Sequence, residues 1–211
     1  MLTFLNGPLA FFGWHDLKVK PLKIQCQIFC SAHKELTRAD YLRLVAAAKQ
    51  KGNQRLSLLL QIICATGIRV SELRHITAEA VQCGCAQVDC KGKRRTVFLP
   101  EKLRRVLKSY LKTQKRTAGP VFVTKTGKSI DRSNIWRNMK ALCKSAGAEP
   151  GKVFPHNLRH LFARTYYAQE KDLSRLADVL GHSSVATTRI YTMESGGIHA
   201  KQLKRMGLVT T

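Results

Sequence analysis

Residues 56–65 constrain the fold more than any other segment, because their side chains are apolar almost without exception. A helix that is apolar on all sides has to be buried, since it leaves no face suited to water. Gly67 follows after Thr66 and suits the left-handed position that ends many helices. We therefore predict a buried helix around which the other elements pack.

Amphipathic segments surround this run, with apolar residues spaced three and four apart, as on one face of a helix. Thr37 is a suitable N-cap for the first of them, and Asp40 is placed to bond back to the start of that helix. Asp172 can cap a later helix that ends at Gly181. Either Ser183 or Ser184 can cap the last one. The expected helices lie in residues 36–48, 56–65, 70–73, 103–111, 135–143, 156–159, 172–181 and 184–191.

Three short β-prone stretches complete the domain. Residues 86–90 and 96–99 read as a hairpin whose basic turn spans residues 91–95. A third strand is expected at residues 121–123, before the turn at Gly127. The fold class predicted is α+β, mostly α, with a small three-stranded antiparallel sheet.

The domain pattern occupies residues 36–195, and the two ends differ from it. Residues 1–35 contain the end of an apolar helix, interrupted by Gly7 and Pro8, and then a basic connector. Residues 196–211 place apolar side chains at nearly helical intervals. We expect a short N-terminal appendage, one compact domain and a C-terminal helix.

The charge points to a polyanionic partner. The 211 residues contain 37 Lys plus Arg against 13 Asp plus Glu, a formal net charge of +24. A 44% hydrophobic fraction argues against disorder. Basic side chains that neutralise phosphates release condensed counterions, so nucleic acid is the first candidate, ahead of an anionic membrane surface.

Targeting signals and disulfides are not expected. The N-terminal apolar stretch lacks a basic start and a cleavage site, and no segment has the roughly 20 apolar residues of a spanning helix. Seven cysteines, an odd number, favour a reducing cytoplasm. Cys83, Cys85 and Cys90 match no common zinc spacing, so no metal and no other cofactor is predicted.

A set of reactive side chains suggests phosphoryl transfer. Taken singly, each has an ordinary explanation: a solvated arginine, a charged turn, a packed tyrosine. Together they provide a nucleophile, two phosphate clamps, proton partners and an acid for the leaving oxygen. Few acids accompany them, so a two-metal nuclease has little support. The set comprises Tyr191, Arg69, Arg159, His156, His182 and a lysine of the basic turn.

Four blocks in order make the chain resemble the catalytic domain of the tyrosine recombinases, or phage integrases. They are ATGIRVSEL (65–73), CKGKRRTVFLP (90–100), HNLRHLFA (156–163) and LGHSSVATTRIYT (180–192). His182 lies 23 residues after Arg159 and 9 before Tyr191, spacings typical of that family.

The resemblance implies a role for each residue. Tyr191 would attack the scissile phosphate of double-stranded DNA and form a 3′-phosphotyrosyl link. Arg69 and Arg159 would grip the non-bridging oxygens, with a hydrogen bond from His182. His156 would accept the tyrosine proton. No metal or ATP is needed, because the phosphotyrosine conserves the bond for rejoining.

The leaving 5′-oxygen would be protonated by a lysine of the turn. Lys91 is preferred because it precedes a glycine, as in the family, and Lys93 is the alternative. Further DNA contacts are expected from basic residues of the turn and the last helix: Lys93, Arg94, Arg95 and Arg189. His160 should face about 100° away from Arg159 and pack.

The resemblance also exposes what the chain lacks. Family members usually carry a helical clamp domain before the catalytic one, and residues 1–35 resemble only its last helix and linker. We therefore hold open a fragment or a naturally shortened product. The C-terminal helix could dock on a neighbouring protomer or fold back on its own domain.

Three functions remain at this point. The first is a cytoplasmic, nucleoid-associated DNA recombinase or integrase of a mobile element, monomeric without DNA and tetrameric in a synaptic complex. The second is a DNA-binding remnant that occupies sites without completing exchange. The third is a relaxing activity like that of type IB topoisomerases, which use the same chemistry.

Overall fold

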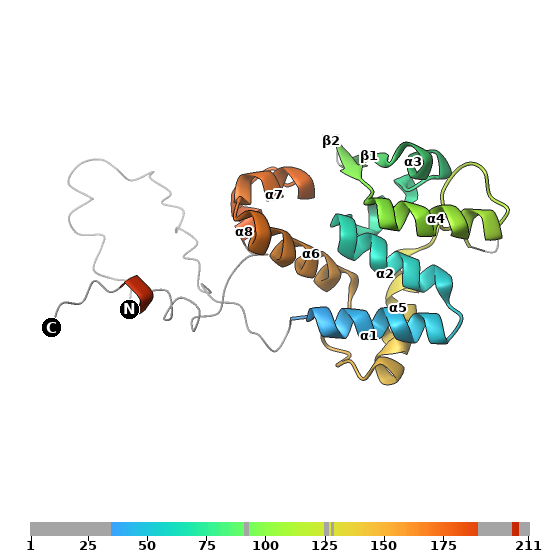
Figure 1. Cartoon of the computed structure of the whole chain (residues 1–211), viewed down its shortest axis with the longest axis horizontal. Helices are drawn as coiled ribbons and strands as arrows, with labels where there is room; N and C mark the ends of the chain where they lie inside the picture. Colours follow the sequence, from blue (N-terminus) through green and yellow to red (C-terminus); the bar gives the residue numbers. More distant parts are fainter. Residues whose placement is uncertain (1–34, 91–92, 125–126, 128, 190–203, 207–211) are drawn as a thin grey trace, which may run out of the picture.

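A mostly helical fold surrounds one central helix. The structure is a computed structural model and describes residues 35–90, 93–124, 127, 129–189 and 204–206. The helix α2 (Gln54–Thr66) contacts α1 (Arg38–Gln50), α4 (Glu101–Thr113), α5 (Arg132–Ala146) and α6 (Pro155–Glu170) (Figure 1). The smaller elements are η3 (Val70–His75), α3 (Ala78–Cys83), β1 (Cys85–Cys90), β2 (Lys93–Phe98), α7 (Leu173–Leu180) and α8 (Val185–Arg189).

The prediction of a buried central helix is confirmed. Leu58, Leu60 and Ile62 of α2 are almost completely excluded from solvent. The helix ends at Gly67, which adopts φ 64°. Its apolar sequence thus folds as the core against which four helices pack.

Two predicted helix caps are also confirmed. The Thr37 side chain accepts from the Asp40 backbone N–H, and the Asp40 carboxylate accepts from the Thr37 backbone N–H. Asp172 accepts from the Arg175 N–H at the start of α7. These bonds join residues three apart and depend on local sequence alone.

The hairpin pairs in the expected antiparallel sense, with Val88 opposite Arg95. Successive strand residues point to opposite faces. Val97 is accordingly buried, whereas Phe98 is 75% exposed.

The predicted third strand is wrong, because the sheet of the described residues has two strands. The backbone N–H of Val121 donates to the Ile76 carbonyl, and Thr77 and Pro120 form an isolated bridge. Val121 and Phe122 are buried. The segment therefore pairs with the connection between η3 and α3 and adds its apolar side chains to the core.

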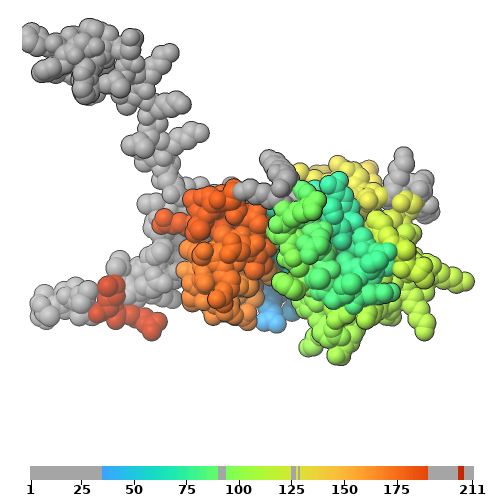
Figure 2. All heavy atoms as spheres, turned by 90° about the horizontal axis from the view of Figure 1, so that it is seen from above, coloured from blue at the N-terminus to red at the C-terminus, as the bar shows by residue number. Residues whose placement is uncertain are grey.

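Helices α6, α7 and α8 form the part of the fold that lies beside the hairpin (Figure 2), and α6 also packs on α2. Ala163, Leu176 and Leu180 make a small second core, against which Phe162 packs. Contacts between this part and the loop after α2 bring together residues far apart in the sequence.

The predicted terminal segments, residues 1–35 and 196–211, fall almost entirely outside the described residues. Among the helices that the structure describes, none combines the length and apolar character needed to cross a membrane.

Candidate active site

Arg69 is held at the start of η3. Its backbone is extended, and its guanidinium donates to the Glu72 carboxylate at 2.8 Å and to the Gly181 carbonyl at 3.3 Å. The side chain keeps 31% of its surface exposed. Arg69 is thus fixed in direction and still accessible to an anion.

Arg159 lies on α6 and is only 2% exposed. One guanidinium nitrogen donates to the Gly67 carbonyl, and the other donates to the Leu180 carbonyl at 2.7 Å. Both acceptors belong to helix C-termini, where carbonyl groups lack partners within the helix. Arg159 therefore joins the ends of α2 and α7 as well as lining the site.

His182 follows α7 and contacts Arg159, with 2.9 Å between Nε2 and Nη2. A guanidinium only donates, so Nε2 accepts. Nδ1 then carries the hydrogen and donates to the Thr188 hydroxyl at 2.8 Å. Burial, then the charges of Arg159 and Arg69, lower the pKa of His182 to about 4. Donation from Nε2 to a phosphate, the role the resemblance implies, requires the Arg159 contact to open and Nε2 to carry a hydrogen, either by a change of tautomer or by protonation of the ring.

His156 occupies the first turn of α6. Burial, followed by the charges of Arg159, Arg132 and Arg69, lowers the pKa of His156. The ring is therefore neutral near pH 7 and can accept a proton. His160, predicted to be a packing residue, packs edge-on against the His156 ring, with 4.8 Å between the ring centroids.

Glu72 is a site residue that the sequence reasoning missed. Its carboxylate is 2% exposed, and it accepts from Arg69 and, at 2.6 Å, from Arg95. Burial by itself would raise the pKa of Glu72, but the Arg69 hydrogen bonds and the charges of both arginines lower it. The signal was present as an acid three residues after Arg69, on the same side of a helical turn.

The basic residues of the hairpin and last helix divide into two groups. Arg94 and Arg189 are exposed, and the Arg94 side chain lies 3.8 Å from Asp89. Arg95, also expected to contact DNA, is 12% exposed and bonded to Glu72 and to the Val179 carbonyl. Lys93 begins β2. Lys91 and Tyr191 lie outside the described residues.

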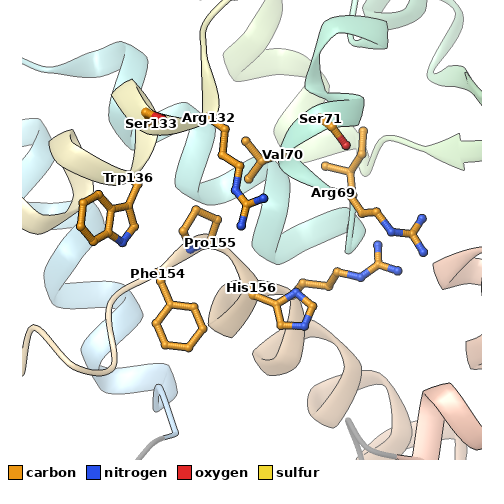
Figure 3. A pocket seen from close by; sticks show the side chains of 11 residues that line it. Arg69, Val70, Ser71, Arg132, Ser133, Trp136, Phe154, Pro155 and His156 are labelled. Atoms are coloured by element: carbon orange, nitrogen blue, oxygen red, sulfur yellow. The ribbon is translucent and has the colours of Figure 1, made fainter. Parts of the chain in front are cut away.

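A cleft of about 600 Å³ opens beside the arginines and His156 described above (Figure 3). Arg69, His156 and Arg159 line one side of it. Its other walls were not predicted. They come from the residues on either side of Arg69, from the start of α5 and from the beginning of α6. They comprise Ile68, Val70, Ser71, Arg132, Ser133, Trp136, Phe154 and Pro155.

The site suits a phosphate. Two guanidiniums and two imidazoles gather there, and Arg69 keeps part of its surface exposed to an anion. Within the described ranges, no group of three His, Cys, Asp or Glu side chains could hold a metal ion. Fold and site together define a mostly helical domain with a cationic centre.

The chain belongs to the phage integrase family, whose model matches residues 34–196. Over 150 residues it is 35% identical to tyrosine recombinase XerD of Xanthomonas campestris pv. campestris, covering 64% of this chain and 46% of that one. The fold matches the crystal structure of XerA recombinase with a TM-score of 0.70 at 29% identity, over 86% of this chain and 67% of that one.

A third match is the XerH site-specific recombinase, solved bound to its difH substrate as a pre-cleavage complex. The TM-score is 0.64 and the identity 26%, over 75% of this chain and 50% of that one. The chain spans about half the length of the curated relatives it matches.

Proposed function

We propose that the chain is the catalytic part, residues 36–195, of a tyrosine-type site-specific DNA recombinase. One observation carries the proposal. Arg69 and Arg159, 90 positions apart, both bond to carbonyls at the end of α7, Gly181 and Leu180, beside His182. This convergence of two arginines and a histidine supports the proposal that a scissile phosphate binds beside them.

Tyr191 is the proposed nucleophile. Its oxygen attacks phosphorus, and the bond from phosphorus to the 5′-oxygen breaks, leaving a 3′-phosphotyrosyl link. Only two residues separate Tyr191 from Thr188, which bonds His182, so the length of chain between them permits an approach to the site. Since a free phenol has a pKa of about 10, cationic neighbours are needed for reaction near neutrality.

Protons move through two further groups in this proposal. Neutral His156 accepts the proton of Tyr191. Lys91, with Lys93 as the alternative, protonates the departing 5′-oxygen. Arg69 and Arg159 stabilise the growing charge on the non-bridging oxygens, and donors of this kind are often worth about 10²–10³ in rate.

The proposed partners are double-stranded DNA and other recombinase protomers in a synaptic tetramer. The net charge of +24 supports the first. The XerH relative, solved with its substrate, supports it as well. We also propose a cytoplasmic location on nucleoid DNA, supported by free thiols at Cys64, Cys83, Cys85 and Cys143.

The test is covalent capture. The chain is incubated with nicked suicide duplexes carrying candidate sites, and products are separated on a denaturing gel. Wild type should form a protein–DNA adduct, Tyr191→Phe none, and Tyr167→Phe, a matched loss of one hydroxyl on α6, the wild-type amount. Binding without any adduct would favour the DNA-binding remnant, and an adduct with Tyr191→Phe would disprove the nucleophile.

A further inference from the structure

Arg95 occupies an interior position that its sequence neighbours do not share. It alternates with Arg94 along β2, so the two side chains leave opposite faces of the hairpin. The Arg94 side chain is 85% exposed and that of Arg95 is 12% exposed. A guanidinium on the inner face needs bonded partners, because burying a charge without them is unfavourable.

Its first partner also holds Arg69. The Glu72 carboxylate receives Arg69 Nη1 at 2.8 Å on one oxygen and Arg95 Nη2 at 2.6 Å on the other. Two cations thus share one buried anion. Arg69 is oriented by Glu72 without being fully neutralised, and it retains attraction for a phosphate.

Its second partner is the end of α7. Arg95 Nη1 donates to the Val179 carbonyl at 2.9 Å, and the Arg95 side chain lies against Gly181. A Cβ at Gly181 would meet Arg95 Cδ at 2.5 Å and Nε at 2.6 Å. Gly181 itself accepts from Arg69, and His182 comes next in the chain.

We propose that Arg95 is a positioning residue for strand cleavage, which joins the β1–β2 hairpin to Glu72 and to the end of α7 and so holds Arg69 and His182 in place. The inference rests on the proposed function for its chemistry. It assigns Arg95 to the interior of the site instead of the DNA-contacting surface. It also links the centre to the hairpin whose turn contains Lys91.

The rate of adduct formation at saturating protein tests the proposal. Arg95→Gln should lower this first-order rate about 10- to 100-fold, since small displacements of catalytic groups have effects of this order, while DNA affinity changes less than about threefold. Arg105→Gln, which removes a 74% exposed guanidinium on α4, is the matched control and should leave the saturated rate unchanged. Guanidinium ion added to Arg95→Ala should restore part of the rate. A wild-type rate for Arg95→Gln, or a loss confined to affinity, would overturn the proposal.

A second measurement does not depend on cleavage. Hydrogen–deuterium exchange is compared between the wild-type chain and Arg95→Lys, which keeps the charge but cannot bridge both acceptors in the same way. Peptides covering residues 176–189 should exchange faster in the variant, while α1 should not change. Unchanged exchange at residues 176–189 would refute the positioning role. Absence of any wild-type adduct would instead count against the proposed function.

Discussion

At the scale of single residues, the site depends on groups whose charge is controlled by their neighbours. Arg159 forces Nε2 of His182 to accept, and burial keeps that ring neutral. Glu72 remains ionised although it is buried, because two arginines bond to it. One of the few acids of the chain therefore serves to orient its cations.

The low pKa of His182 predicts how stability depends on pH. In the folded state the pKa is about 4, below the ordinary value of about 6.5 expected in the unfolded chain. The unfolded state thus binds a proton at a higher pH, so this contribution is fully present above pH 7 and is lost as the pH falls toward 4. We expect His182→Asn to lose less unfolding free energy than wild type between pH 7.5 and pH 5. Urea titrations at both pH values measure it, and equal losses would contradict the expectation.

At the scale of elements, helix ends build the site. The C-terminus of α2 supplies the Gly67 carbonyl to Arg159, and that of α7 supplies the Leu180 carbonyl. Gly67 has no room for a side chain, since a Cβ there would lie 2.5 Å from Phe162 Cδ1 and 2.9 Å from Leu180 Cδ2. The glycine that ends the central helix also permits close packing of α6 and α7.

Two glycine substitutions separate these effects. Gly147, at the end of α5, has φ 56°, and a Cβ added there would meet no atom of the described residues within 4 Å. Gly147→Ala should therefore lower the free energy of unfolding by about 1–2 kcal/mol, the cost of a left-handed backbone at alanine. Gly67→Ala should lower the free energy of unfolding by about 1–3 kcal/mol more than Gly147→Ala, because it adds a clash in a packed interior. Denaturant unfolding of both variants measures the difference. Equal losses would show that the contact with Phe162 is relieved without strain.

At the scale of the whole molecule, the basic side chains divide into buried and exposed ones. Some arginines, such as Arg95 and Arg159, are used inside the structure. Others, such as Arg94 and Arg189, are exposed. The net charge of +24 thus overstates how many cations can meet phosphates.

Salt dependence of DNA binding distinguishes the two groups. The logarithm of the affinity should fall linearly with the logarithm of the salt concentration, with a slope of about −0.9 for each phosphate neutralised. Arg94→Gln should reduce the slope by about 0.9, whereas Arg95→Gln should leave it unchanged because its guanidinium is bonded to Glu72. Fluorescence anisotropy with a labelled duplex measures both. A flat wild-type response would argue against phosphate binding.

Much of the fold could be predicted because its signals are local. The caps at Thr37 and Asp172 join residues three apart, and the central helix is evident from ten nearly uniform side chains. The prediction of a third strand failed because it depended on a distant partner. Residues 121–123 have strand-forming side chains, but a strand needs a partner, and the neighbour that Val121 finds is Ile76, 45 positions earlier.

The sequence by itself determined the central helix, the caps at Thr37 and Asp172 and the hairpin, since these depend on residue type and short spacing. Only the tertiary structure decided which cations serve which purpose. Arg94 and Arg95 are adjacent and equally basic, yet strand alternation sends one outward and the other to Glu72. The physical reason is that a buried carboxylate has to be paired, and its partners are chosen by packing between elements distant in the chain.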